Sequence, residues 1–236
     1  IKVEFTGDQC VLSATDLDTW MSVTIQANGD SFDFVFRNSA NIQKVCRHFD
    51  GTLELDLQQR GDEAFLTMRS GGKGGEFPVY DTEDCPTWPE FEVKQTHTAN
   101  AAKILACVKQ VKYAVNPRAI KLDYQGVLFQ NRHIWAVEGH RAACCDDGGL
   151  DVEAPFLVGV SALEQLKAFG DADMQIGVAD EWVLFQNEHI RLLAKRIPNA
   201  APITYESVVP QKWNEEFCFH RKDFVQALKY LLACVG

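Results

Sequence analysis

An internal repeat restricts the fold of this 236-residue chain more than any other feature of its sequence. Residues 156–178 read as an apolar strand, a short helix that begins near a serine, a turn and an alternating strand. Residues 34–57 read in the same order, and the alternating strand begins at Leu53, 121 positions before Met174. Self-similarity at this period indicates two copies of one unit.

Further segments extend the repeat toward the N-terminus of each copy. Residues 127–130 match residues 3–6 in pattern, and residues 136–138 match residues 14–16 at an offset of 122. Leucines and polar residues alternate along residues 53–58, which is typical of a sheet with one buried face. The sequence therefore predicts an α+β fold of repeated domains, each with helices on one face of an antiparallel sheet.

The two copies differ at their beginnings. Residues 99–115 are predicted to form an amphipathic helix, whose apolar stripe is Ile104, Leu105, Val108, Val111 and Val115. Nothing comparable precedes Ile1, whereas residues 219–235 repeat this opening helix. We therefore expect a truncated first domain over residues 1–92, a complete second domain over residues 93–210, and the start of a third over residues 211–236.

Two local features of the first copy are predicted from spacing and turn chemistry. Residues 38–49 are expected to form a short helix with Ser39 as its N-cap and with Ile42, Val45 and Phe49 on its apolar side. Four glycines, at positions 71, 72, 74 and 75, are expected to form the flexible tip of a hairpin.

Composition narrows the classes of protein to consider. Hydrophobic residues make up 46% and charged residues 24%, as in globular proteins. No apolar run reaches the roughly 18 residues that a membrane span needs, and no signal peptide is visible before the first strand. The eight cysteines include no C-x-x-C pair, so we expect reduced thiols in a cytosolic protein.

Charge is distributed unevenly along the chain. The net charge of −10 argues against a protein that coats nucleic acid through bulk charge. Residues 93–122, however, contain six basic residues and no acid, and residues 34–49 carry Lys44 and Arg47 without an acid after Asp33. Lys109 and Lys112 repel each other with no acid near them in the sequence. Two interpretations remain, a solvated helix face and a surface for a polyanion.

Four segments, in order along nearly the whole chain, resemble the bacterial DNA polymerase III beta subunit family, the sliding clamps. Residues 14–18 (ATDLD) are similar to the family's A-T-D-L-E, and residues 136–142 (AVEGHRA) to its A-T-D-G-H-R-L. Residues 84–86 (DCP) are similar to its D-F-P, and residues 199–210 to its F-P-D-Y-x-x-V-I-P. The resemblance implies a ring closed as a head-to-tail homodimer, with helices lining a central hole and sheets outside.

The resemblance also implies a role in DNA replication, as a processivity factor that slides on double-stranded DNA. Inner helices would then offer diffuse phosphate contacts without reading bases. The residues implied to contact DNA are Lys44, Arg47, Lys103, Lys109, Lys112, Asn116 and Arg118, and Lys167 is a further candidate.

A peptide-binding cleft is implied between the second and third domains. Its partners would be short linear peptides of the DNA polymerase III catalytic subunit and of the clamp loader, in the bacterial cytoplasm. The implied cleft residues are Tyr124, Val137, Gly139, His140, Arg141, Ala142, Pro202, Ser207 and Val208. Departures from the family pattern at Val137, Glu138, Ala142 and Ser207 predict a shallower or differently tuned pocket. No cofactor, metal or membrane contact is implied.

Three other interpretations stay open. The Gly139–Arg141 segment could be a simple turn, with glycine at positive φ and a polar pair that satisfies local carbonyls. A hydrolase could pair His140 with Cys144 or Cys145, or His133 with a carboxylate, but no nucleophile-elbow pattern is present. A metal site is not indicated either, because His133, His140, Cys144 and Cys145 have no recognised metal-ligand spacing. A clamp-fold binding module that does not encircle DNA is the third interpretation.

Overall fold

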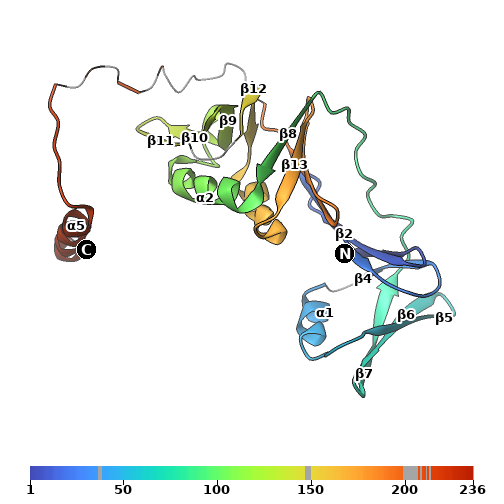
Figure 1. Cartoon of the computed structure of the whole chain (residues 1–236). Helices are drawn as coiled ribbons and strands as arrows, with labels where there is room; N and C mark the ends of the chain where they lie inside the picture. The colour runs from blue at the N-terminus through green and yellow to red at the C-terminus, as the bar shows by residue number, and fades with distance from the viewer. Residues whose placement is uncertain are drawn as a thin grey trace. The chain divides into compact units, whose positions relative to one another are not determined.

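The computed structural model describes residues 1–36, 39–146, 150–198, 207, 209–210, 212 and 214–235. Contacts group the chain into two units, Ile1–Pro202 and Ile203–Gly236. Within the described residues, all the strands lie in the first unit and form two antiparallel sheets, as Figure 1 shows. No helix in the described ranges is long and apolar enough to span a bilayer.

The first copy of the repeat contains four strands, a helix and three more strands. They are β1 (Lys2–Phe5), β2 (Gln9–Thr15), β3 (Thr19–Gln26), β4 (Phe32–Phe36), α1 (Ser39–Cys46), β5 (Glu54–Arg60), β6 (Glu63–Ser70) and β7 (Lys73–Tyr80).

The second copy has the same order after an additional strand and helix. It comprises β8 (Gln95–Asn100), α2 (Ala101–Val111), the 3₁₀ turns η1 (Lys112–Ala114) and η2 (Leu122–Tyr124), β9 (Val127–Asn131), β10 (His133–Glu138), β11 (Arg141–Cys145), β12 (Val152–Val158), α3 (Val160–Leu163), η3 (Glu164–Phe169), β13 (Asp173–Val178), β14 (Trp182–Gln186) and β15 (Ile190–Lys195).

Strand pairing confirms the repeat. The order β11-β10-β9-β12 in the second copy matches β3-β2-β1-β4 in the first. The register agrees as well, because Thr15 pairs with Trp20 and the residues 122 positions later, Val137 and Ala142, also pair. The two copies therefore share their topology and their hairpin register.

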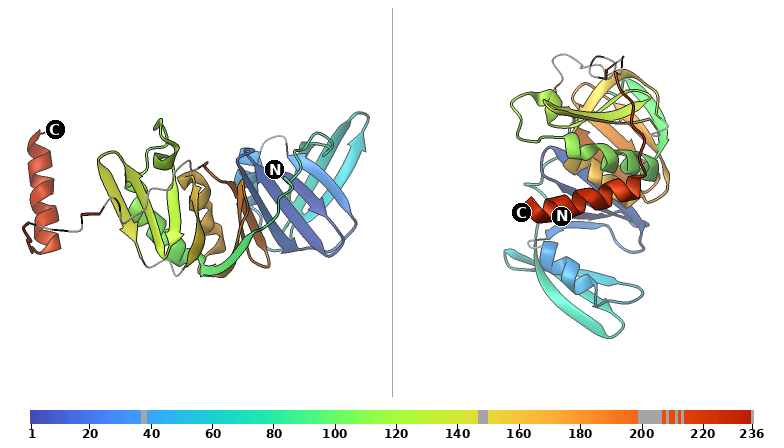
Figure 2. Two further views of the ribbon diagram at one scale, coloured as in Figure 1. Left: turned by 90° about the horizontal axis from the view of Figure 1, so that it is seen from above. Right: turned by 90° about the vertical axis from the view of Figure 1, so that its left-hand side faces the viewer.

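The two copies join edge to edge. Strand β3 pairs with β15, from Thr19 opposite Ala194 to Val23 opposite Ile190, and this ladder links the copies into one sheet of eleven strands. The segment between the copies runs alongside this sheet (Figure 2). It packs against β3 through Trp88, whose ring lies 5.9 Å from the ring of Trp20. Sequence patterns did not predict this connection, because it pairs strands about 170 residues apart.

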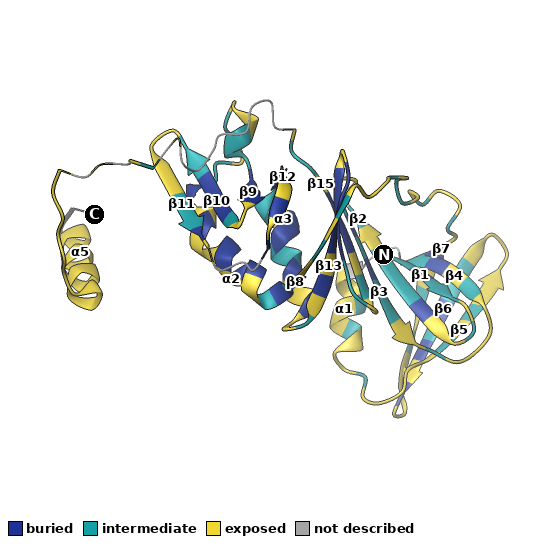
Figure 3. Cartoon of the chain, turned by 45° about the horizontal axis from the view of Figure 1, so that its top comes forward, coloured by how far each residue is buried: buried dark blue, intermediate teal, exposed yellow. Residues whose placement is uncertain are grey.

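The core of the second copy is built around α2, whose inner side is dark blue in Figure 3. Ile104, Val108 and Val111 are completely buried, as their helical spacing predicts. The helix is shorter than the predicted 99–115. Ala99 lies in β8, where it pairs with Met174, and Asn100 caps the helix by accepting a hydrogen bond from the Lys103 amide (3.1 Å).

The first copy has a smaller buried core. Its fully enclosed residues are Val3, Cys10, Phe34, Leu66, Met68 and Val79, and half-buried side chains, including Ile42 and Phe49, pack around them. Helix α1 confirms the predicted helix in part, ending at Cys46, while the Ser39 side chain lies outside the described residues.

The glycine-rich tip was predicted too long. Only Gly71 and Gly72 form the turn, with φ angles of 55° and 77°. Gly74 and Gly75 lie in β7 opposite Arg69 and Met68, because the β6–β7 ladder continues to the residues next to the turn.

In the second unit, helix α5 (Arg221–Val235) confirms the predicted helix over residues 219–235, starting two residues later. Phe219 precedes the helix, and its ring stacks on that of Phe224 at 4.3 Å. The large apolar side chains of α5 are exposed, namely Phe224, Leu228, Leu231 and Leu232.

Candidate DNA-contacting and peptide-binding surfaces

The lysines of α2 lie on the side of the helix opposite its buried stripe. Lys103 and Lys109 are exposed, in agreement with the angular spacing of the sequence. On α1 and the turn that follows it, Lys44 and Arg47 are exposed as well. These four cations are therefore accessible to a ligand.

Lys112 differs from its neighbours on α2. Its Nζ forms an ion pair with Glu164 Oε1 at 2.8 Å, between η1 and η3. The hydrogen bond from Lys112 lowers the pKa of the Glu164 carboxyl, and the charges of Lys167 and Lys109 act in the same direction. No acid lies near Lys112 in the sequence, but the inference that it is therefore uncompensated was wrong, because Glu164, 52 residues away, pairs with it.

The loop after α2 brings together residues from both predicted surfaces. The Asn116 amide donates to the Tyr124 carbonyl at 2.8 Å, and Asn116 Oδ1 accepts from the Arg118 amide at 3.1 Å. The Asn116 side chain also helps to lower the pKa of Glu138, at the end of β10. Residues implied for DNA contact and residues implied for the cleft are thus parts of one hydrogen-bonded structure.

The β10–β11 hairpin carries most of the predicted cleft wall. Arg141 donates from Nε and from an Nη atom to Glu138 Oε2, at 3.0 and 2.7 Å. These bonds hold the pKa of Glu138 below its ordinary value, with smaller contributions from Asn116 and His140. His140 and Ala142 are exposed at the hairpin, so they are available for contact.

Gly139 and His140 form the turn between β10 and β11, as one interpretation of the sequence held, but two details of that interpretation are corrected. Gly139 does not adopt positive φ. Arg141 binds the Glu138 side chain, not local carbonyls. A Cβ at Gly139 would meet no atom within 4 Å, so the local backbone does not require glycine there.

The structure describes only some of the other predicted cleft residues. Val137 and Tyr124 are half-buried, and η2 packs against β10, so both belong to the same wall. Ser207 is exposed and belongs to the second unit. Pro202 and Val208 lie outside the described residues.

The structure separates the cysteine and histidine residues that the sequence grouped. Cys145 is buried against α2, where its thiol donates to Cys107 Sγ at 2.6 Å. His140 lies at the exposed hairpin tip. His133 and Cys144 do come together, and they are joined by Asp146.

This architecture, two repeats joined through one continuous antiparallel sheet with a capped helix packed beneath the second, is that of a sliding clamp. No protein-family model and no curated protein sequence matches the chain. Solved structures do match it.

Several of the matched structures are DNA polymerase III beta subunits. The Bacillus subtilis sliding clamp gives a TM-score of 0.81 at 17% identity, over 97% of this chain and 64% of that one. The Pseudomonas aeruginosa beta subunit gives 0.75 at 16% identity, over 89% and 60%. A Helicobacter pylori beta clamp bound to a DNA ligase peptide gives 0.78 at 14% identity, over 97% and 66%.

These matches confirm the predicted resemblance and the fold class. At such low identity they show the fold alone. The chain spans about 60–66% of the length of these clamps.

Proposed function

We propose that this chain is part of a DNA sliding clamp, which encircles duplex DNA and tethers a replicative polymerase. The observation that carries the proposal is the match to the Bacillus subtilis clamp over 97% of the chain. The proposal includes a head-to-tail ring and the three domains over residues 1–92, 93–210 and 211–236. It assigns the chain a non-catalytic role in the bacterial cytoplasm.

The charge pattern supports a sliding contact with DNA. Lys103 and Lys109 project from α2 into solvent, while the chain as a whole carries −10. A few exposed cations can bind phosphates weakly, and an acidic body limits binding elsewhere. Lys112 would contribute less than its neighbours, because Glu164 already neutralises part of its charge. Lys44, Arg47, Asn116 and Arg118 complete the proposed DNA surface.

The hairpin wall supports peptide binding. The Helicobacter pylori clamp was solved with a DNA ligase peptide, and we propose that this chain takes linear peptides of the polymerase catalytic subunit and the clamp loader. Val137 and Tyr124 would supply apolar contact, and the exposed His140 and Ala142 would form the rim. The Glu138–Arg141 ion pair would orient that rim.

The test is polymerase processivity on primed circular DNA, measured with the full-length gene product and its clamp loader. We expect the protein to lengthen the products made in one binding event. Reversal of both charges, Lys103→Glu with Lys109→Glu, should shorten retention on circular DNA and reduce the slope of log affinity against log salt by about 2.

Lys73→Glu is the matched control, since Lys73 is an exposed lysine at the β6–β7 hairpin and not on α2. Unchanged processivity with the loader present would remove the clamp proposal. Peptide binding without retention on circular DNA would instead identify a clamp-fold binding module that does not encircle DNA.

A further inference from the structure

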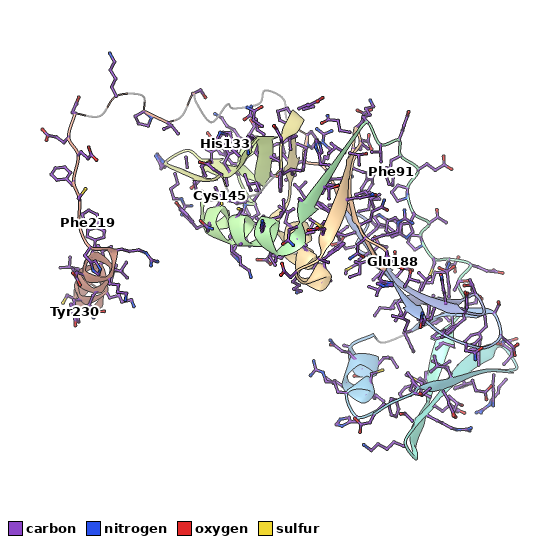
Figure 4. The ribbon with its side chains drawn as sticks, in the orientation of Figure 1. Phe91, His133, Cys145, Glu188, Phe219 and Tyr230 are labelled. Carbon is purple, nitrogen blue, oxygen red and sulfur yellow. The ribbon has the colours of Figure 1, made fainter. Side chains whose placement is uncertain are left out.

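The base of the β10–β11 hairpin carries a cluster of three potential metal ligands. His133 Nδ1 lies 2.7 Å from Asp146 Oδ1 and 3.7 Å from Cys144 Sγ, and Cys144 Sγ lies 3.2 Å from the same Asp146 oxygen. Cys145, labelled with His133 in Figure 4, instead contacts α2 through Cys107. The three ligand atoms therefore converge on one point at the face of the hairpin away from that helix.

Hairpin register explains the cluster. Trp135 pairs with Cys144 and Ile134 with Cys145, so His133 falls opposite Asp146. Side chains alternate between faces of a strand, which places His133, Cys144 and Asp146 on one face. The equivalent positions in the first copy, 122 residues earlier, are Val11, Ser22 and Thr24.

The comparison between copies shows that the fold does not require these residues. Strands β2 and β3 form the same hairpin in the same register with no potential metal ligand at the three positions. A cluster that the scaffold does not need calls for another explanation.

The geometry is unsuited to nucleophilic catalysis. In a nucleophile–histidine–carboxylate triad, the nucleophile and the carboxylate bond to opposite ring nitrogens of the histidine. Here both Cys144 and Asp146 approach Nδ1. A proton relay through the ring is therefore not built, and the hydrolase interpretation that paired His133 with a carboxylate loses its support.

We propose that His133 Nδ1, Cys144 Sγ and Asp146 Oδ1 bind one Zn²⁺ ion, with water as the fourth ligand. Zinc accepts thiolate, imidazole and carboxylate ligands in tetrahedral geometry, and its usual bond lengths separate neighbouring ligand atoms by about 3.3–3.6 Å. The two distances to Cys144, 3.7 and 3.2 Å, are close to that range. Only the His133–Asp146 pair, at 2.7 Å, must open by about half an ångström to admit the ion.

The three groups can together compensate the charge of a divalent cation. A Cys144 thiolate beside the Asp146 carboxylate brings two negative charges together, and a divalent cation removes that repulsion. On binding, the thiol proton leaves to solvent, and neutral His133 binds through Nδ1 with its single ring proton on Nε2. His133 has 26% of its side chain exposed and Asp146 72%, so an ion has access.

A bound ion would cross-link the two strands at the base of the hairpin, and the tip of this hairpin carries His140 and Arg141. The site rests on side chains of one hairpin and is independent of the proposed clamp function. Loss of processivity would leave it untouched, and absence of metal would leave the clamp proposal untouched.

The test is metal binding by the full chain after treatment with a chelator. We expect one Zn²⁺ per chain by elemental analysis. With Co²⁺ as a probe, we expect a thiolate-to-cobalt charge-transfer band and the intense visible absorption of tetrahedral cobalt. Cys144→Ser, His133→Gln and Asp146→Asn should each weaken binding at least about tenfold, since even outer-sphere substitutions have effects of that size.

Two matched controls separate this site from the other thiols and histidines. Cys46→Ser removes an exposed cysteine on α1, and His140→Gln removes the histidine at the tip of the same hairpin. Both should bind metal like the wild type. Circular dichroism checks that every variant is folded, and Zn²⁺ should raise the unfolding temperature of the wild type but not of Cys144→Ser. A cobalt spectrum without the thiolate band, or equal binding by all variants, would overturn the site.

Discussion

The two copies of the repeat share one topology but differ in how deeply they bury their cores. In the second copy, α2 places Ile104, Val108 and Val111 completely out of solvent. In the first copy, where the described chain has no counterpart of β8 and α2, side chains such as Ile42 and Phe49 are only half-buried. Strand order and register survive this difference. The sheets therefore define the topology of the repeat, and the opening helix supplies much of its hydrophobic stabilisation.

The largest expected effect tests that division with one substitution at two sites. Ile104→Ala should lower the free energy of unfolding by about 2–5 kcal/mol, because the side chain is fully buried and leaves a cavity. Ile42→Ala on α1 should cost about 1 kcal/mol, since only part of its side chain leaves water on folding. Urea denaturation followed by circular dichroism measures both. Equal losses would show that the first copy is as tightly packed as the second.

A smaller effect is expected at the start of α2. Asn100→Ala should cost about 1 kcal/mol, because the Lys103 amide loses its side-chain acceptor. Asn100→Ser keeps a side-chain acceptor at the cap and loses the donations from Nδ2 to the Asp171 carbonyl and to Asp173 Oδ1, so it should cost less. Thermal unfolding of the three proteins compares them. If Asn100→Ser is as damaging as Asn100→Ala, the contacts of Nδ2 with Asp171 and Asp173 matter more than the cap.

The smallest effect concerns the ion pair beneath α2. Glu164→Gln should lower stability by about 0.2–1 kcal/mol at neutral pH, as expected for a pair with both partners exposed by more than 40%. Because the folded-state pKa of Glu164 is lowered, its contribution is present above the unfolded pKa and disappears as pH falls through the folded value.

The wild type and Glu164→Gln should therefore converge in stability only in acid, below the lowered folded-state pKa of Glu164. Denaturation curves at several pH values measure this convergence. Glu153→Gln, at an exposed position on β12, controls for the loss of a surface charge. A difference between wild type and variant that persists in acid would mean that Glu164 acts through packing.

Local patterns predicted α2 well and its first residue badly. The apolar stripe identified the buried face, because side chains three and four positions apart share one side of a helix. Ala99 was assigned to the helix because nothing in its neighbourhood shows that β8 pairs with β13 there. The predicted length of the glycine-rich turn was wrong for the same reason, since Gly74 and Gly75 pair with a partner strand.

The candidate surfaces also have some features that local sequence predicts and others that depend on distant parts of the chain. Exposure of Lys103 and Lys109 follows from their position on the helix, and the sequence predicted it. The Lys112–Glu164 ion pair joins elements far apart in the chain. The ligand cluster was recoverable in principle, because a hairpin centred between Gly139 and His140 places His133 opposite Asp146. Ligand spacing along the chain does not reveal the cluster, because its residues meet across the hairpin.

By itself, the sequence determined the repeat, the positions of most strands and helices, and the separation of a basic helix from an acidic body. These properties depend on residues within a few positions of one another or on direct comparison of two segments. Only the tertiary structure decided the β3–β15 junction, the neutralisation of Lys112 and the meeting of His133, Cys144 and Asp146. Each depends on which strand edges and side chains meet in space, and sequence periodicity does not carry that information.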